Sequence, residues 1–237
     1  MRPHPIIFLY QAASAACVMI IPLFAAELGA TSLEIGIIGT CYGIAIFLSS
    51  YLFGKSGDVY TKKFVIMLGL LASSLTFGMQ MFAEDLLSLA LVRFLVGFSV
   101  GIFRPALTAY AYESKSNFGR FLSFGPLGMA VGCFLAGLIA VYYHIFAFSS
   151  LCMILAFFVA FTLTPTETKK KPRMNSRKHL IKKDFWIYLA FFLRHTGANS
   201  VWIILPLFIE EIGGNIRCIG FLYTMNFVVQ VILMNML

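Results

Sequence analysis

The sequence predicts an all-α, polytopic transmembrane protein. Of its 237 residues, 60% are hydrophobic and only 12% are charged, and the mean hydropathy is +0.88. A soluble domain carries roughly twice this charged fraction, so the apolar residues here must face lipid. The apolar runs are about 20 residues long and do not alternate with polar residues. This pattern favours membrane-spanning helices over the strands of a barrel.

Eight apolar runs are each long enough to cross a bilayer. The first run is too long for the apolar part of a signal peptide and is followed by further spans, so we expect it to be a retained first helix. Most connections between the runs are short, and the exception is the stretch 165–184. The predicted spans are residues 6–27, 34–53, 64–83, 87–110, 120–142, 145–164, 185–209 and 217–236.

The basic residues of the connections lie almost entirely on one side of the predicted membrane. The 165–184 stretch alone holds eight lysines and arginines, whereas the connections on the other side carry acidic residues and, among basic ones, only Arg217. Because positively charged loops stay in the cytoplasm, we expect a multi-pass protein of the cell membrane with a cytoplasmic N-terminus. The net charge of +8 is therefore an orientation signal, and we expect no nucleic-acid partner.

An internal repeat relates the first two spans to the last two. A shift of 184 positions superimposes one pair on the other without a gap, and a proline, a glutamate and two glycines coincide. Two parallel six-helix repeats are a known transporter plan. We expect residues 1–164 to form a six-helix bundle, 165–184 a basic cytoplasmic linker, and 185–237 the first two helices, 7 and 8, of an incomplete second bundle. The coinciding pairs are Pro22 with Pro206, Glu27 with Glu211, Gly29 with Gly213 and Gly36 with Gly220.

The loop between the second and third spans reads Gly54-Lys-Ser-Gly-Asp58-Val-Tyr-Thr-Lys62-Lys63. A carboxylate beside a helix N-terminus accepts hydrogen bonds from free N–H groups, and a glycine lets helices approach closely. The loop resembles the signature loop of the major facilitator superfamily, although Val59 and Thr61 stand where that family often has a basic residue and a glycine. The alternative is an ordinary cytoplasmic turn. The resemblance implies gating roles for Gly54, Asp58, Lys62 and Lys63.

The fourth and fifth spans carry arginine and glycine patterns. Arg93 lies inside a span, where a charge costs several kcal/mol unless it faces a cavity or a partner, or snorkels to the surface. Followed by glycines, it resembles the family's second motif. A Gly-Pro pair in the fifth span is similar to the family's antiporter signature, with Met129 departing from it, but helix packing is the safer interpretation. The predicted packing residues are Gly97, Gly101, Gly125, Pro126, Gly128 and Gly132.

Further polar residues are candidates for a central cavity. Arg104 follows Arg93 by eleven residues, about three turns, so both side chains leave the helix in the same direction. In the family that the motifs resemble, helices 1, 4, 7 and 10 are thought to line the cavity, which implies such a place for Arg104; the alternative is an anchor at the inner membrane surface. Near mid-depth of the seventh span, Arg194 would extend a cationic wall. The candidate cavity residues are Arg93, Arg104, Arg194, Tyr10, Gln11 and Asn199.

The sequence gives no sign of enzyme chemistry. It contains no Walker loop, HExxH, GxSxG or dinucleotide-binding glycine pattern, and its five cysteines form no CxxC pair, so we expect no catalytic residue, metal or cofactor. No Asp or Glu lies deep in a predicted span, although ion-coupled carriers usually keep one there. The coupling carboxylate then lies in helices beyond this sequence, or His195 replaces it, or the protein is a uniporter.

The resemblance implies a secondary transporter of major facilitator fold that moves a small solute by alternating access. A cationic cavity suggests an anionic substrate, while drug-like solutes stay open. Expected partners are the solute, a coupling proton or ion, the lipid bilayer, and a separately encoded chain that supplies helices 9–12. The alternatives are a non-transporting truncated remnant or one piece of a split transporter. A membrane enzyme is less favoured, because clustered acids or histidines at one membrane face are absent.

Overall fold

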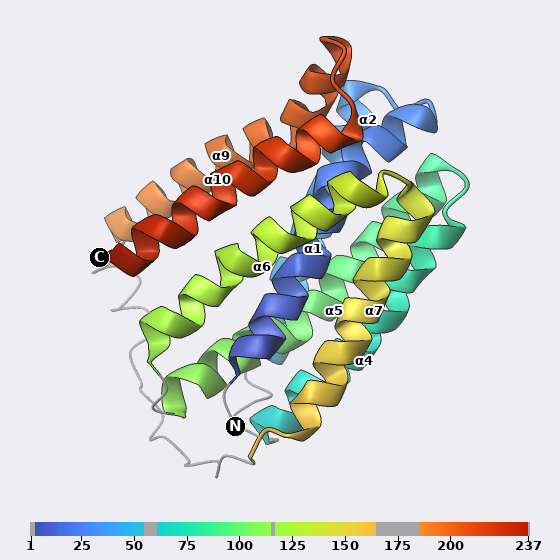
Figure 1. Ribbon diagram of the computed structural model, residues 1–237. Helices are drawn as coiled ribbons and strands as arrows, with labels where there is room; N and C mark the ends of the chain where they lie inside the picture. The colour runs from blue at the N-terminus through green and yellow to red at the C-terminus, as the bar shows by residue number, and fades with distance from the viewer. Residues whose placement is uncertain (1–2, 55–60, 115–116, 165–184, 237) are drawn as a thin grey trace.

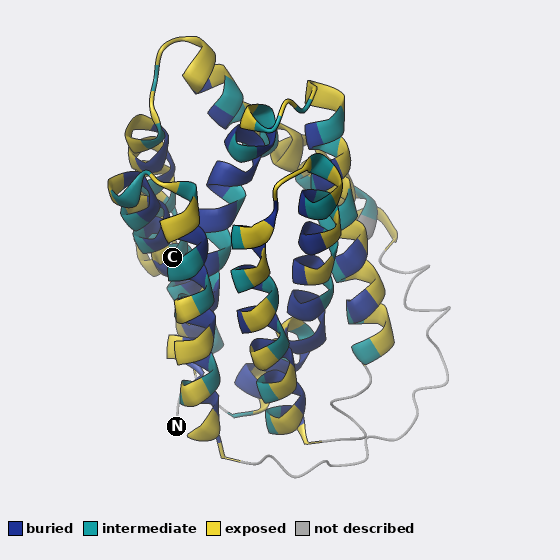
Figure 2. Ribbon diagram, turned by 90° about the vertical axis from the view of Figure 1, so that its right-hand side faces the viewer, coloured by how far each residue is buried: buried dark blue, intermediate teal, exposed yellow. Residues whose placement is uncertain are grey.

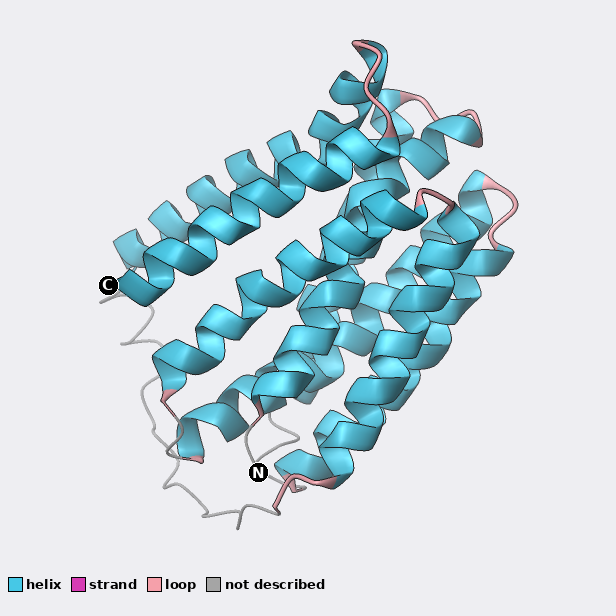
Figure 3. Ribbon diagram, in the orientation of Figure 1, coloured by secondary structure: helices cyan, strands magenta, loops and turns pink. Residues whose placement is uncertain are grey.

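The computed structural model describes residues 3–54, 61–114, 117–164 and 185–236, which form long α-helices and one short 3-10 helix, without a strand (Figures 1 and 3). Each predicted span corresponds to one helix, with ends shifted by a few residues. The all-helical prediction is therefore confirmed. The elements are α1 (His4–Glu27), α2 (Ser32–Phe53), α4 (Lys62–Met79), η1 (Gln80–Phe82), α5 (Leu86–Glu113), α6 (Phe118–Ile139), α7 (Tyr142–Phe161), α9 (Phe185–Glu211) and α10 (Ile216–Met236).

Seven stretches of the described residues are long and apolar enough to cross a membrane, and they comprise every long helix except α9. α9 has 27 residues, but Arg194, His195 and Asn199 interrupt its apolar sequence. Exposed large apolar side chains cover the outward faces of the helices, as lipid contact requires, and Figure 2 shows the buried residues on their inward faces. The chain is thus a multi-pass membrane protein.

The helices run back and forth between two ends of the bundle (Figure 1). We call the first the N-terminal end: there α1, α4, α6 and α9 begin, and α2, α5 and α7 finish. The opposite end holds the connections 28–31, 83–85, 140–141 and 212–215. By the charge asymmetry of the sequence, the N-terminal end is the predicted cytoplasmic end.

Packing joins helices that are not neighbours in the sequence. α1 packs against α6 and α7, while α5 lies between α2 and α4. α10 packs along α6, and α9 contacts α1, so the last two helices lie beside the first six (Figure 1). α1 and α5 therefore lie in the middle of the first six helices. α5 also supplies most of the residues of the site described below.

The turns after α1 and α9 have the same backbone geometry. Gly29 has φ +85° and Gly213 has φ +89°, the left-handed conformation that glycine adopts at helix ends. The Gly29 N–H donates to the Ala26 carbonyl, and the Gly213 N–H donates to the Glu210 carbonyl, each at 2.9 Å. Both pairs are separated by the 184 positions of the sequence repeat. The weak repeat thus corresponds to a repeated turn.

The helix starts that follow these turns are also equivalent. The Thr31 hydroxyl accepts a hydrogen bond from the Glu34 N–H, and the Asn215 side-chain oxygen accepts one from the Cys218 N–H. Such side chains satisfy N–H groups that have no partner within the helix. These positions again differ by 184. Superposition of the complete hairpins at this offset stays a prediction.

Candidate functional site

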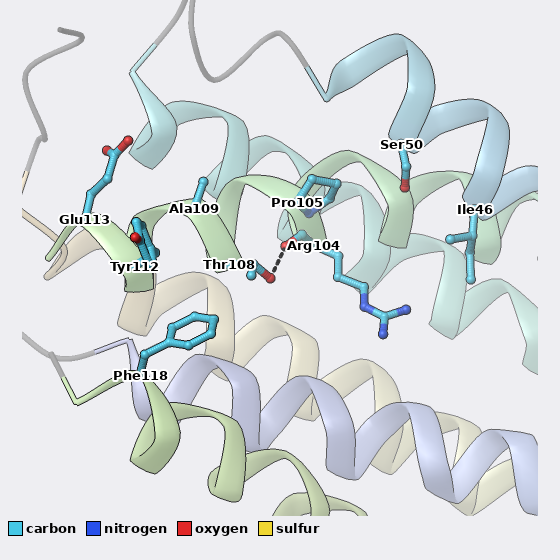
Figure 4. Close-up of a pocket in the computed structure, with 9 residues that line it drawn as sticks. All are labelled: Ile46, Ser50, Arg104, Pro105, Thr108, Ala109, Tyr112, Glu113 and Phe118. Carbon is cyan, nitrogen blue, oxygen red and sulfur yellow. Dashed lines mark hydrogen bonds between the residues drawn. The ribbon is translucent and has the colours of Figure 1, made fainter. Parts of the chain in front are cut away.

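An open groove with a volume of about 630 Å³ lies towards the N-terminal end, between α2, α5 and α6 (Figure 4). Its volume falls within the range of about 300–1,000 Å³ that is common for small-molecule sites. α5 contributes most of the wall, with two residues from α2 and one from α6. The lining residues are Ile46, Ser50, Arg104, Pro105, Thr108, Ala109, Tyr112, Glu113 and Phe118.

A proline shapes the wall where α2 meets α5. Pro105 has no N–H, so the carbonyl of Gly101, four residues earlier, loses its partner within the helix. The Ser50 hydroxyl of α2 donates to this carbonyl at 3.3 Å. In a membrane, where water is scarce, such a side chain is the usual way to satisfy a freed backbone group. The bond thereby ties the two helices together beside the groove.

Arg104 brings a positive charge into the groove. Its side chain is exposed, and Figure 4 shows the guanidinium extending away from Glu113. Its electrostatic neighbours are the hydroxyls of Tyr10 and Tyr42, and within the described chain no carboxylate forms an ion pair with it. Tyr10 is buried, with its ring edge-on to Phe103 at 5.1 Å. Two predicted cavity residues, Arg104 and Tyr10, therefore lie near each other, and of the two only Arg104 lines the groove.

The basic residues at the start of α4 bind the ends of two other helices. Lys62 is 7% exposed, and its Nζ lies 2.8 Å from an oxygen of Glu113 at the end of α5. The Lys63 Nζ donates to the carbonyl of Phe161 at the end of α7. A cation is favoured at a helix C-terminus, because the carbonyls there carry partial negative charge. These lysines thus fix the ends of α5 and α7 to α4.

Gly54 and Asp58 are the other two predicted gate residues of the signature loop. Gly54 follows α2 directly, and a Cβ added there would approach the Ser50 carbonyl oxygen to 2.5 Å. A larger residue would therefore crowd the last turn of α2. Asp58, the predicted gate residue, lies outside the described residues.

Arg93 occupies a different environment from Arg104, although both leave α5 on the same side. Arg93 is 3% exposed; its Nη1 donates to Gln80 at 3.2 Å, and its guanidinium lies 4.3 Å from the Tyr42 ring centroid. The reason is position along the helix: near the opposite end, α2 and η1 cover this side of α5. Arg93 therefore does not line the groove. Sequence reasoning missed Gln80 and Tyr42, which only the fold brings to Arg93.

Four of the five predicted packing glycines lie where helix backbones meet, whereas Gly125 lies beside the Gln11 side chain. Gly97 and Gly101 face backbone carbonyls of α2, and Gly128 and Gly132 face those of α1; a Cβ at any of them would overlap these atoms. Pro126 lies within α6 and is partly buried. Small residues permit such close contact where packing, rather than exclusion of water, holds helices together.

The remaining predicted cavity residues do not join the groove. Gln11 of α1 lies beside α6, where a Cβ added at Gly125 would be 3.5 Å from its side-chain nitrogen. Arg194 and Asn199 of α9 are exposed, and no described side chain forms an ion pair with Arg194. His195 stacks on Phe191 at 3.8 Å. The groove, as far as the described residues define it, includes Arg104 and none of the α9 residues.

Close contacts between the first six helices and the last two lie mainly towards the opposite end. Gly220 of α10 lies against Gly137 of α6, since a Cβ at Gly220 would be 2.7 Å from the Gly137 Cα. A Cβ at Gly39 of α2 would lie 3.0 Å from Ile203 of α9. Nearer mid-depth, the Thr224 hydroxyl donates to the Ala130 carbonyl at 3.2 Å. The two groups of helices are therefore in close contact towards this end, while the groove lies towards the N-terminal end.

Charge is divided along the depth of the bundle. All described carboxylates lie in connections or in the first or last turn of a helix, whereas Arg93, Arg104 and Arg194 lie within helices. One acid in a connection, Asp85, caps α5, and hydrogen bonds from Ser88 lower the pKa of its carboxyl group.

Among the described residues no group of three His, Cys, Asp or Glu side chains could hold a metal ion. The groove is suited to binding a solute near a cation.

Comparison with known proteins gives a consistent assignment. Residues 5–237 match the family described as Major Facilitator Superfamily. The chain is 28% identical over 194 residues to an uncharacterized MFS-type transporter of Methanocaldococcus jannaschii, an alignment that covers 78% of this chain and 50% of the relative. It thus spans about half the length of that relative.

Two further relatives carry names connected with drug resistance. A multi-drug resistance efflux pump PmrA homolog of Lactococcus lactis is 28% identical over 113 residues, which are 45% of this chain and 28% of the relative. The quinolone resistance protein NorA of Staphylococcus aureus is 25% identical over 152 residues, 61% of this chain and 39% of the relative. In both cases the alignment covers less than half of the relative.

Proposed function

This chain belongs to the Major Facilitator Superfamily of membrane transporters, and we propose that it moves a small solute across the membrane by alternating access. The family is in general non-enzymatic. The observation that carries the proposal is the groove around Arg104, which lies towards the N-terminal end, while contacts such as Gly137 with Gly220 join the helices towards the opposite end. A solute site accessible from one side only is what alternating access requires of each end state.

The repeated hairpins support a working arrangement of two bundles. Residues 1–164 would form one bundle and 185–237 would begin the second, with the basic 165–184 stretch as the cytoplasmic link. Rocking about the central site would separate α10 from α6 at the opposite end and close the groove at the N-terminal end. The chain spans about half the length of its relative from M. jannaschii, so the activity of a complete two-bundle transporter is itself part of the proposal.

The ion pair at the groove supports a gating role for the signature loop. Lys62 holds Glu113 beside the groove, so the loop is coupled to the end of α5, the helix that carries Arg104. We place Gly54, Asp58, Lys62 and Lys63 in this gate, and Arg104 at the solute, with the buried Tyr10 as its neighbour. The names of the drug-resistance relatives favour export of a drug-like solute. A coupling proton or ion is part of the proposal.

Cysteine labelling of two threonines tests the proposal. In a background without native cysteines, Thr108→Cys reports the groove and Thr224→Cys reports the α6–α10 contact. With a membrane-impermeant maleimide, we expect Thr108→Cys to react in inside-out vesicles and not in intact cells, and Thr224→Cys to react slowly from either side. Adding Gly220→Leu, which cannot form the close contact with Gly137, should speed labelling of Thr224→Cys from outside and slow that of Thr108→Cys from inside.

Two outcomes would contradict the proposal. Labelling of Thr108→Cys in intact cells would reverse the orientation. If Gly220→Leu changed neither labelling rate, the two ends would not be coupled, and a non-transporting remnant would become the better interpretation. The same substitution at Gly197, an α9 position with no atom near an added Cβ, is the matched control and should leave both rates unchanged.

A further inference from the structure

We propose that the groove binds an amphiphilic organic anion, with the Arg104 guanidinium on its anionic group and the apolar wall around its body. The inference rests on the proposed transport function, since the groove is the same site. It narrows the substrate from any small solute to one class of charge and shape.

The charges of the groove leave Arg104 available. Two of the described residues that line it are ionised, Arg104 and Glu113. Lys62 lies 2.8 Å from Glu113, so that carboxylate is already neutralised from the neighbouring helix. Within the described chain no acid is paired with Arg104. Among the described residues, the groove thus presents one positive charge without an ion-pair partner, and none of its described carboxylates is available to a cationic solute.

Two of the three hydroxyls among the described wall residues, those of Ser50 and Thr108, have internal partners, and the third belongs to Tyr112. The Ser50 hydroxyl donates to the Gly101 carbonyl, and the Thr108 hydroxyl donates to the carbonyl of Arg104 at 3.0 Å. Each hydroxyl has one proton to donate, so neither of these two donates to a solute without breaking its bond. The guanidinium, with five N–H donors, is consequently the main polar anchor of the groove.

The rest of the wall is apolar and large enough for a sizeable organic body. Ile46, Pro105, Ala109 and Phe118 supply aliphatic and aromatic surface from three helices. A volume of about 630 Å³ exceeds the needs of an inorganic anion. One cationic anchor within such a wall matches a single carboxylate, sulfonate or phosphate on an apolar body. That chemistry is shared by free organic anions and by anionic lipids.

Three probes with the same ring system and different charge separate the substrate classes. The full chain in nanodiscs of zwitterionic lipid is titrated with naphthoate, naphthamide and naphthylmethylammonium, and binding is measured by equilibrium dialysis. We expect naphthoate to bind best, by about tenfold or more over the neutral amide, since a charge-assisted hydrogen bond is the main difference between them. Preferential binding of the ammonium probe, or equal binding of all three, would overturn the inference.

Substitutions locate the binding. Arg104→Gln should weaken naphthoate binding by about tenfold or more and leave naphthamide binding unchanged, and Arg104→Lys should keep part of the preference. Arg217→Gln, an equal change of charge at the opposite end, is the control. If Arg104→Gln keeps the full naphthoate preference, the assigned site is wrong. Measuring the naphthamide affinity of each variant guards against loss of folding.

Lipid composition distinguishes the two sources of the anion. If phosphatidylglycerol added to the nanodiscs displaces naphthoate from the unaltered chain, an anionic lipid is the occupant; if it does not, a free organic anion is. Both results retain the anion class. The cysteine-labelling experiment tests transport separately, so rejection of the anion with coupled labelling intact would leave the proposed function standing.

Discussion

The α1–α2 and α9–α10 hairpins share a sequence repeat and the same turn, yet their surroundings differ. α1 is buried along much of its length between α6 and α7, whereas the only described α9 side chains that are buried are Pro206 and Ile209. The two turns nevertheless keep equivalent hydrogen bonds at the 184-residue offset. Local sequence therefore fixes the turn, while burial depends on which other helices lie alongside.

The largest expected effect is a difference in stability between alanine substitutions at two glycines with different surroundings. Gly132 of α6 lies against the α1 backbone, whereas a Cβ at Gly197 of α9 would meet no atom within 4 Å. Gly132→Ala should destabilise the protein by about 1–3 kcal/mol through overpacking. Gly197→Ala should stabilise it by up to about 1 kcal/mol, because alanine favours the helix. Unfolding in mixed micelles by a denaturing detergent measures both, and equal effects would contradict the contrast in packing.

An intermediate and equal effect is expected at the two repeated turns. Gly29 and Gly213 both have positive φ and open space around an added Cβ. Gly29→Ala and Gly213→Ala should each destabilise by about 1 kcal/mol, since the left-handed conformation strains any residue with a Cβ. The same micelle unfolding measures them. A difference of more than a factor of two would show that the turns are equivalent in geometry but not in energy.

The smallest expected effect concerns a bond that the first hairpin lacks. Pro206 deprives the Trp202 carbonyl of its helical partner, and the Tyr223 hydroxyl donates to that carbonyl at 2.8 Å. The position equivalent to Tyr223 in the first hairpin is Gly39. Tyr223→Phe should cost about 0.6 kcal/mol, the average for hydrogen bonds between membrane helices. Tyr51→Phe, at an exposed site on α2, is the control. An equal loss of stability there would show that the loss at Tyr223 does not come from its hydrogen bond.

The candidate site was only partly predictable. Arg93 and Arg104 are recognisable in the sequence because a charge within an apolar span needs a partner. The sequence does not indicate that one of them is covered and the other lines a groove. Arg93 is covered by Gln80 and Tyr42, which come from η1 and α2, while the same side of α5 three turns later is open. Glu113, at the end of a span, gave no signal that it would line a groove or pair with Lys62.

The helices, their approximate ends and the repeated turn follow from the amino-acid sequence alone. These depend on the length of apolar runs and on capping residues within a few positions, both of which are local properties. Which polar groups meet, in contrast, depends on the packing of whole helices. Ser50 reaches the carbonyl that Pro105 frees, and Lys62 reaches Glu113, across about fifty residues of chain. Such pairs follow from how helices pack side by side, and that packing depends on many small contacts summed over whole helix faces, which no single local pattern encodes.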